Sequence, residues 1–378
     1  MDLVCFSHLR WNFVYQRPQH LFSRFANQFR VFFIEEPIYN LFAEDHLHIS
    51  LSKENVWIIV PYLKENSDSD IIIRQKKLLH KLFAEMDISD YIFWYYTPMA
   101  LSVSDEFKPK IIIYDCMDEL SAFKFAPANI KALESELMNK ADIVFTGGLS
   151  LYEAKKDNHN NIFPFPSSID KEHFLKARTN VKEPKDQAGI EFPRIGFFGV
   201  IDERLDIELI EKVAIAKPQW QIILIGPIVK IDEATLPKQK NIHYLGSKSY
   251  QQLPEYISGW QIAIIPFALN ESTRFISPTK TPEYLAAGKP VISTAIKDVV
   301  NPYGEKKLVH IIHSPQEFIK SAEQELNEID KTEWLHFVDE FLTDNSWDKT
   351  WYQMNELIKQ KLNQKKIKTH IKKKEAYV

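Results

Sequence analysis

Residues 262–293 read IAIIPFALNESTRFISPTKTPEYLAAGKPVIS. An apolar run, Ile262–Phe267, is followed by a polar segment, by a helical pattern over Pro282–Ala287, and by a second apolar run, Pro290–Ser293. When a strand, a helix and a strand follow one another in this way, the helix carries the chain back across the sheet and the two strands lie parallel. This stretch therefore predicts a parallel sheet covered by helices.

The same alternation extends over most of the 378 residues, and it stops once, at a polar stretch that contains Pro184. Apolar runs of strand length before this stretch are Leu3–Ser7, Val31–Glu35, Val56–Tyr62, Tyr91–Tyr96, Ile111–Cys116, Ile143–Thr146 and Ile162–Phe165. After it they are Ile195–Ile201, Gln221–Ile225, Ile242–Leu245, Ile262–Phe267, Pro290–Ser293 and Val309–His313. We therefore expect an α/β fold with two Rossmann-like, doubly wound domains that face a central cleft, divided as 1–187 and 188–345.

Composition excludes several classes of protein. Hydrophobic residues make up 45% of the chain and aromatic residues 13%, so both domains can bury a core and intrinsic disorder is not expected. The net charge of −4 argues against a nucleic-acid binder. Two cysteines allow neither a disulfide framework nor a four-cysteine zinc site. The N-terminus lacks the features of a signal peptide and no run of 18 apolar residues occurs, so we expect a cytoplasmic protein.

Candidate site residues are sought where strands end, because ligands of open parallel sheets bind at the carboxyl ends of the strands. Neither domain has the Gly-x-Gly-x-x-Gly of a dinucleotide oxidoreductase, and there is no Gly-Lys-Ser/Thr phosphate loop. No Asp-x-Asp follows a strand, and no His, Cys and Asp residues have metal-ligand spacing, so we expect no metal. The polar residues that follow predicted strands or open the next helix are His8, Arg17, His20, Asp118, Arg204 and Gly226.

The helix predicted near residue 282 carries a separate set of candidates. Lys280 and Thr279 precede it, and free N–H groups at a helix start attract a phosphate. Glu283 lies three residues after Lys280, on the same face, where a carboxylate could accept both hydroxyls of a ribose. A simpler interpretation is that Glu283 only complements the helix dipole and that Lys280 is solvated. The spacing alone leaves both interpretations open.

Three segments resemble one known family. Pro278-x-Lys280-x-x-Glu283-Tyr284, followed by Ala-Gly-x-Pro-Val-Ile, is similar to the nucleotide-sugar signature of GT-B glycosyltransferases of the large family 4 group, the glycosyl transferases group 1. The start HLRWNFVYQRPQHLFSRFA resembles transferases of teichuronic acid and polysaccharide biosynthesis, and IGFFGVIDERLD resembles the strand whose following arginine contacts the pyrophosphate. Two departures are visible: Phe275 stands where the family has the first Glu of Glu-x7-Glu, and Pro166-Ser167-Ser168-Ile169-Asp170 replaces Pro-Asn-Gly-Val-Asp.

The resemblance implies a GT-B glycosyltransferase that moves a sugar from UDP or GDP to a glycan or polyprenyl-linked acceptor, with retention, in cell-surface polysaccharide synthesis. Arg204 and Lys280 would stabilise the leaving diphosphate, with Thr279, Glu283 and Gly226 also at the donor. Asp118 resembles the position where relatives carry a polar residue on the acceptor side. From the residues alone, His8 could contact the donor phosphate or an acceptor hydroxyl, or simply form a hydrogen bond at its strand end, and Arg17 and His20 form a positive helix start that we expect on the acceptor side. No cofactor or metal is implied.

The C-terminal segment is expected to complete the first domain and to end in a basic tail. The resemblance implies that a helix at 346–364 crosses back to domain 1–187. Residues 365–378, rich in lysine, would form a tail that could contact an anionic membrane surface. Two rival functions remain open: a nucleotide-sugar epimerase of the same fold, and a non-catalytic subunit that binds the nucleotide sugar.

Overall fold

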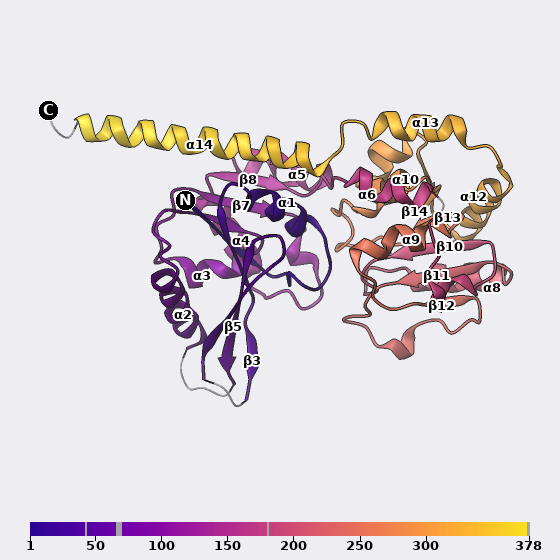
Figure 1. Ribbon diagram of the computed structural model, residues 1–378, viewed down its shortest axis with the longest axis horizontal. Helices are drawn as coiled ribbons and strands as arrows, with labels where there is room; N and C mark the ends of the chain where they lie inside the picture. Colours follow the sequence, from indigo (N-terminus) through magenta and orange to yellow (C-terminus); the bar gives the residue numbers. More distant parts are fainter. Residues whose placement is uncertain (42–43, 66–69, 180, 376–378) are drawn as a thin grey trace. The chain divides into compact units, whose positions relative to one another are not determined.

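The computed structural model describes residues 1–41, 44–65, 70–179 and 181–375, with side chains up to residue 368. The chain forms two compact units, each with its own parallel sheet. Unit 1 comprises Met1–Pro166 and Asp348–Val378, and unit 2 comprises Ser167–Trp347. The α/β architecture predicted from the strand–helix alternation is therefore confirmed (Figure 1).

In the described residues, the sheet of unit 1 has nine strands, ordered β3-β5-β2-β1-β6-β7-β8-β9, with β4 antiparallel to β5 at one edge. Their bounds are β1 Asp2–Ser7, β2 Arg30–Glu35, β3 Ile38–Asn40, β4 His46–Leu51, β5 Val56–Lys64, β6 Tyr91–Tyr95, β7 Ile112–Cys116, β8 Ile143–Thr146 and β9 Ile162–Pro164. All other pairs are parallel, so β1, β6 and β7 end at one edge of the sheet. The loops that carry the predicted residues of unit 1 start at this edge.

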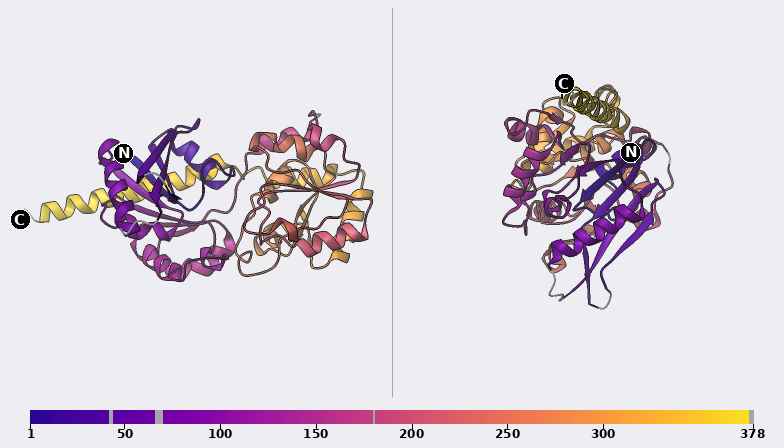
Figure 2. Two further views of the ribbon diagram at one scale, coloured as in Figure 1. Left: turned by 90° about the horizontal axis from the view of Figure 1, so that it is seen from below. Right: turned by 90° about the vertical axis from the view of Figure 1, so that its left-hand side faces the viewer.

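The helices of unit 1 connect these strands, and the C-terminal helix packs beside them. Their bounds are α1 Arg17–Phe25, α2 Ile71–Glu85, α3 Leu101–Ser104, α4 Ile130–Lys140, α5 Leu149–Lys155 and α14 Trp347–Glu375. Helix α14 contacts α1, because the ring of Trp351 packs on Phe25 and Arg24 pairs with Asp348 at 2.7 Å. Figure 2 shows α14 alongside this unit in both views.

Unit 2 has a wholly parallel sheet in the order β12-β11-β10-β13-β14-β15. Its strands are β10 Arg194–Phe198, β11 Gln221–Ile225, β12 Ile242–Tyr244, β13 Ile262–Ile265, β14 Val291–Thr294 and β15 Val309–Ile312. Its helices are α6 Lys171–Leu175, α7 Lys185–Ala188, α8 Ile207–Ala216, α9 Leu253–Ser258, α10 Lys280–Ala286, α11 Lys297–Val299, α12 Pro315–Asn327 and α13 Thr332–Phe341. Strand β13, helix α10 and strand β14 form the predicted strand–helix–strand unit.

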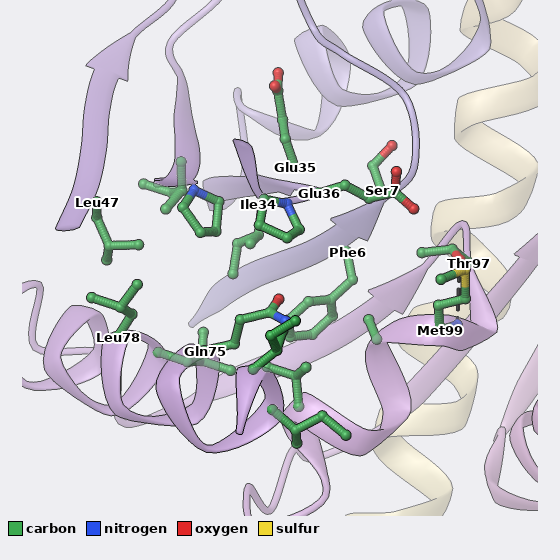
Figure 3. A pocket seen from close by; sticks show the side chains of 18 of the residues that line it. Phe6, Ser7, Ile34, Glu35, Glu36, Leu47, Gln75, Leu78, Thr97 and Met99 are labelled. Carbon is green, nitrogen blue, oxygen red and sulfur yellow. Dashed lines mark hydrogen bonds between the residues drawn. The ribbon is translucent and has the colours of Figure 1, made fainter. Parts of the chain in front are cut away.

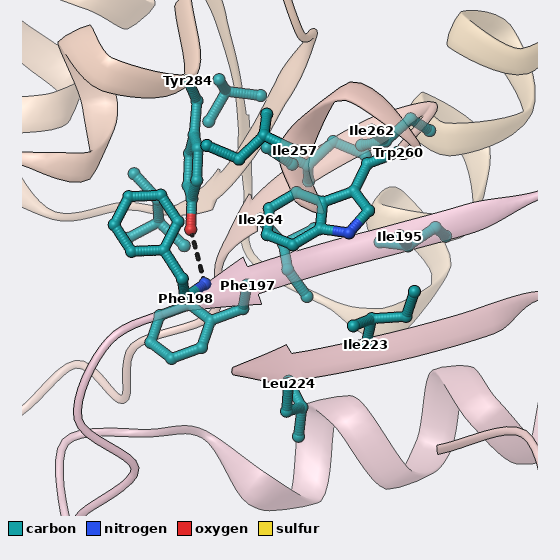
Figure 4. Close-up of a cluster of buried hydrophobic side chains, with 14 of the residues drawn as sticks. Ile195, Phe197, Phe198, Ile223, Leu224, Ile257, Trp260, Ile262, Ile264 and Tyr284 are labelled. Atoms are coloured by element: carbon teal, nitrogen blue, oxygen red, sulfur yellow. Dashed lines mark hydrogen bonds between the residues drawn. The ribbon is translucent and has the colours of Figure 1, made fainter. Parts of the chain in front are cut away.

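The core of unit 2 fixes the central strand β10 against helix α10 (Figure 4). Trp260 packs where Gly196 has no side chain, since a Cβ there would lie 2.0 Å from the indole ring. The backbone N–H of Phe198 donates to the hydroxyl of Tyr284 at 2.9 Å. Both aromatic side chains are fully buried, so the start of α10 is held at a defined place over the end of β10.

The structure differs from the sequence prediction in three places. The division falls after Pro166 instead of after residue 187, because the segment in between packs on unit 2. Phe174 belongs to the unit 2 core, and Arg178 pairs with Asp339 at 2.8 Å. Strands β3 and β4 were not predicted. Residues 365–375 continue helix α14 and do not form a separate tail, which agrees with the high helix propensity of lysine.

Candidate functional site

The ammonium group of Lys280 lies at the carboxyl end of β10, beside Gly199. It makes no hydrogen bond or ion pair with any described residue, and its Nζ lies 5.5 Å from the ring centres of both Phe197 and Phe267. Burial and the nearby charge of Arg204 lower the pKa of Lys280 to about 8, an effect that the carboxylates of Glu283 and Asp202 oppose. The charged form of such a lysine is stabilised when an anion binds beside it.

Two glycines make room for this lysine. Gly199 ends β10 with φ +143°, and a Cβ at this position would lie 2.3 Å from Cε and 2.7 Å from Nζ of Lys280. Gly226 ends β11 with φ +147°, and a Cβ there would lie 1.8 Å from the carbonyl oxygen of Gly199. Gly226 was predicted at the donor site. In the structure, Gly226 packs against the backbone of Gly199 and not against Lys280. It therefore supports the turn at the end of β10 that contacts Lys280.

Glu283 lies one turn after Lys280 on α10 and is buried. Its Oε2 has no hydrogen-bond partner among the described residues. Burial raises the pKa of Glu283, an effect that the charge of Lys280 opposes. An unpartnered buried carboxylate oxygen costs free energy, about 1–3 kcal/mol for a polar group and more for a charge, unless a ligand donates to it.

Arg204 belongs to the loop that follows β10, as predicted. Its side chain is 23% exposed and forms a bidentate ion pair with Asp202, at 3.0 Å from Nε to Oδ1 and 2.7 Å from Nη2 to Oδ2. Asp202 thus sets the direction of the guanidinium. Between them, Glu203 keeps both carboxylate oxygens buried, without a partner in the described part of the chain. Asp202, Glu203 and Gly199 are site residues that the sequence prediction missed.

Thr279 is the N-cap residue of α10, but its side chain makes no capping hydrogen bond. Thr281, next to Lys280, is fully buried, and its hydroxyl has no partner among the described residues. Helix α10 has only seven residues, so its dipole is short and side chains carry most of the charge here. The structure therefore brings five predicted residues together at one edge of the unit 2 sheet: Thr279, Lys280, Glu283, Arg204 and, behind them, Gly226.

In unit 1, His8 and Asp118 lie at the carboxyl edge of the sheet, as predicted. His8 follows β1 and Asp118 follows β7, and the strand β6 lies between these two. The loop of Asp118 is held from below: a Cβ on Gly147 would lie 2.5 Å from the carbonyl oxygen of Met117. The buried Lys155 pairs with Glu119 on the other side at 2.8 Å. Both candidates are partly exposed.

The two residues predicted on the acceptor side are both buried in unit 1. Arg17 is 4% exposed and forms a bidentate pair with the fully buried Asp115, at 3.0 and 2.9 Å. Its Nη1 donates to the carbonyl oxygen of Phe165 at 2.7 Å, so it ties α1 to β7 and to the end of β9. His20 is also buried, with its ring edge-on to Tyr15. The sequence shows that α1 begins with basic residues, but it does not show that their side chains face the interior of unit 1.

Two further properties of the described residues bear on the site. No group of three or more His, Cys, Asp or Glu side chains within them could hold a metal ion. None of the helices in this part of the chain has the length and apolar character that a membrane span needs.

Part of the chain is similar in sequence to known glycosyltransferases. Residues 193–328, which contain Arg204, Lys280 and Glu283, match the family described as glycosyl transferases group 1. A Bacillus subtilis protein described as a teichuronic acid biosynthesis glycosyltransferase, TuaH, is 26% identical over 217 residues, which are 53% of this chain and 54% of TuaH. The chain thus spans about half the length of this curated relative.

Solved structures resemble nearly the whole chain. A sucrose-phosphate synthase from Thermosynechococcus elongatus has a TM-score of 0.69 at 13% identity, covering 95% of this chain and 98% of its own. The Anabaena protein HepE, in complex with UDP and glucose, has a TM-score of 0.66 at 13% identity, covering 95% and 99%. At such identities the likeness concerns the fold. Residues 193–328 are therefore similar to the glycosyl transferases group 1 family, in a chain that has the fold of GT-B glycosyltransferases.

Proposed function

We propose that this protein is a glycosyltransferase that uses a nucleotide diphosphate sugar as donor, bound by unit 2. The observation that carries the proposal is the group of charges at the end of β10. Lys280 makes no hydrogen bond or ion pair with the described residues, Arg204 is directed by Asp202, and Glu283 keeps an oxygen without a hydrogen bond. These groups match the parts of a nucleotide sugar: a diphosphate for the cations and a ribose for the carboxylate.

The two cations act where charge develops. When the glycosidic bond breaks, negative charge builds on the diphosphate, and a fixed cation beside it stabilises the transition state more than the ground state. Lys280 and Arg204 would in this way do the work of a divalent ion, and we propose that the reaction needs no metal. Lys280 is half-buried, which strengthens its interaction with phosphate because less water screens it there than at an exposed site.

Glu283 would hold the ribose. Its unpartnered oxygen could accept hydrogen bonds from the two ribose hydroxyls. Glu283 lies one helical turn after Lys280 on α10, so the ribose contact and the diphosphate contact would be one turn apart. This contact would be made equally in the ground and transition states, so it should contribute to donor affinity more than to turnover.

The acceptor side of the proposal rests on unit 1. His8 and Asp118 at its strand ends are the candidates for contact with the acceptor, a glycan or a polyprenyl-linked sugar. The likeness to TuaH supports a role in cell-surface polysaccharide synthesis, and the complex of HepE with UDP supports UDP over GDP as the nucleotide. We further propose retention of configuration, and contact of the lysine-rich end of α14 with the inner face of the membrane.

Titration of the purified protein with UDP and GDP, followed by a transfer assay, tests the proposal. UDP should bind, and Glu283→Gln should weaken its binding by about 1.5–3 kcal/mol, since a hydrogen bond to a charged group is lost at unchanged volume. In the transfer assay, the sugar of a UDP-sugar should appear on an added acceptor. NMR of the new linkage then reports the anomeric configuration.

The same assay separates the rival functions. Free sugar or an epimerised nucleotide sugar, with nothing added to any acceptor, would indicate an epimerase or hydrolase. Binding without any turnover would indicate a non-catalytic subunit. If UDP binding is unchanged in Glu283→Gln, the site assignment is wrong.

A further inference from the structure

Unit 1 contains a cavity of about 370 Å³ that has no role in the function proposed above. It lies between helix α2, the strands β1, β2 and β5, and the segment from Thr97 to Val103 (Figure 3). Every residue that lines it belongs to unit 1. Its volume falls in the range of small-molecule sites, about 300–1,000 Å³.

The walls of the cavity are mostly hydrocarbon. Side chains from the sheet meet side chains from α2 across it, and Figure 3 shows Leu47 and Leu78 facing each other at one end, with Phe6 in the middle. The sheet contributes Phe6, Ile34 and Ile59, and α2 contributes Leu78, Leu79 and Leu82. A cavity with such walls is poorly suited to water, which needs two to four polar partners, and well suited to an apolar chain.

The opposite end of the cavity is polar. Ser7, Glu36 and Thr97 line it, and they lie at or just beyond the carboxyl ends of β1, β2 and β6. In Figure 3, Ser7 and Thr97 lie on the side away from Leu47 and Leu78. This is the sheet edge where ligands of parallel sheets bind, and His8 is the next residue along the chain.

Some of the apolar side chains that line the cavity are also exposed to solvent. Tyr39, Ile71, Ile72 and Met99 line it and are nevertheless exposed to solvent. Ile71 and Ile72 belong to the first turn of α2, which begins at a proper cap, since the carboxylate of Asp70 accepts from the backbone N–H of Ile72 at 2.7 Å. Exposed apolar residues grouped at an apolar cavity indicate a site that is covered when an apolar ligand is present.

We propose that this cavity binds the hydrocarbon chain of an amphiphilic acceptor whose uncharged, hydroxyl-rich head lies at the Ser7–Thr97 end. The inference rests on the proposed function, because it places that head at the edge where His8 and Asp118 would meet it. Each methylene that enters the cavity raises the affinity about fourfold, so a chain of moderate length is sufficient for binding.

The charge at the polar end favours a sugar head over a phosphate. Glu36 lies there, whereas the carboxylate of Glu35 accepts from Arg10 Nη1 at 3.0 Å and from the backbone N–H of Trp11 at 2.8 Å. Sugar hydroxyls can donate to carboxylates, whereas a phosphate would be repelled by them. The lining thus selects alkyl glycosides or glycolipids within the wider class of lipid-linked acceptors.

Calorimetric titration with methyl, hexyl and octyl β-D-glucosides, below their micelle concentrations and without any nucleotide, tests this inference. Affinity should rise about tenfold from hexyl to octyl glucoside, as two more methylenes are buried. Ile72→Gln, which places an amide at the cavity wall, should weaken octyl glucoside binding about tenfold. Ile73→Gln is the matched control, because Ile73 is 59% exposed, follows in the same helical turn and does not line the cavity. It should stay within twofold.

A second variant and a second probe complete the test. Ala100→Leu adds volume inside the cavity and should weaken the octyl glucoside more than the methyl glucoside. Equal affinity for all three glucosides, or equal loss in Ile72→Gln and Ile73→Gln, would overturn the proposal. Tighter binding of geranyl phosphate than of octyl glucoside would overturn the assignment of a neutral head.

These titrations are independent of the donor site. UDP affinity should be the same in Ile72→Gln as in the unmodified protein. If UDP binds and the glucosides do not, the cavity assignment alone fails. If the glucosides bind with the expected chain-length dependence and UDP does not, the donor assignment fails and the cavity remains a site for an amphiphile.

Discussion

The carboxyl edges of the two sheets use charged residues in opposite ways. In unit 1, the basic groups at this edge are paired inside the protein: Arg17 with Asp115, Arg10 with Glu35, and Lys155 with Glu119 and Glu134. In unit 2, Lys280 makes no hydrogen bond or ion pair with the described residues, and Glu283 and Glu203 keep oxygens without hydrogen bonds. Buried charges without partners destabilise a fold, so they persist where a ligand supplies the missing contacts.

The paired charges of unit 1 therefore contribute to stability, whereas the charges of unit 2 are available to bind a ligand. Removal of a paired charge in unit 1 leaves its partner buried and alone. Removal of Lys280 breaks no hydrogen bond or ion pair with a described residue, and takes away only its longer-range attraction to Glu283 and Asp202. The two kinds of variant should therefore differ in whether stability or function suffers.

The largest effect is expected at Arg17. Arg17→Met leaves the fully buried Asp115 without its bidentate partner, and such losses cost about 3–5 kcal/mol. The midpoint of urea unfolding, followed by hydrogen exchange of the amides in β1 and β7, should fall accordingly. The double variant Arg17→Met/Asp115→Leu removes both charges and should recover most of the loss. If the double variant is no more stable than the single one, the pair is not the cause.

The next effect is expected at Lys280. Lys280→Met should leave the urea midpoint unchanged or slightly higher, and should lower kcat by about 10²–10³, as the loss of one transition-state donor does elsewhere. Gly199→Ala tests the same point without removing the charge, because its Cβ would meet Cε of Lys280 at 2.3 Å and displace the ammonium. It should lower kcat in the same direction. Unchanged turnover in both variants would remove Lys280 from the reaction.

The sequence predicted the fold well because the central strands of both sheets are parallel and buried on both faces. Each of these central strands is a mostly apolar run, which is visible without a structure. Strands β3 and β4 were missed because they lack this apolar run: they lie at an edge of the sheet, and their residues are exposed or half-buried. The division between units was placed too late because Pro184 marks a polar segment, while Phe174 already packs in the unit 2 core.

Within the site, the sequence predicted charges but not their partners. Arg204, Lys280 and Glu283 could be named because the motif puts them on one short helix and one strand end. Arg17 was misassigned since its partner Asp115 lies 98 residues away, and no pattern links the two. Asp202 and Gly199 were missed because their roles depend on the direction of a neighbouring side chain. The cavity beside α2 was also beyond prediction, as it arises from how α2 and the sheet are spaced.

The smallest effect, and the most specific to Lys280, is a dependence of UDP affinity on pH. Burial, assisted by Arg204, lowers the pKa of Lys280 to about 8, and a bound diphosphate would raise this pKa again by stabilising the charged form. Above pH 8 the free protein must therefore take up a proton to bind, and affinity should fall by up to about tenfold per pH unit. Burial raises the pKa of Glu283, whose ionisation on ribose binding would release a proton at lower pH. The measurement is therefore best made at pH 9, where that carboxyl is already ionised.

Calorimetry of UDP binding at pH 9 in two buffers of different ionisation enthalpy gives the number of protons taken up. The unmodified protein should take up most of one proton, and Lys280→Met should take up none. Lys289 provides the control: burial lowers its pKa to about 8 as well, but its Nζ already donates to the carbonyl oxygens of Ser258 and Trp260. Lys289→Met should therefore keep the proton uptake of the unmodified protein. Uptake that persists in Lys280→Met would mean that another group meets the diphosphate, and the contrast between the two strand edges would then need a different explanation.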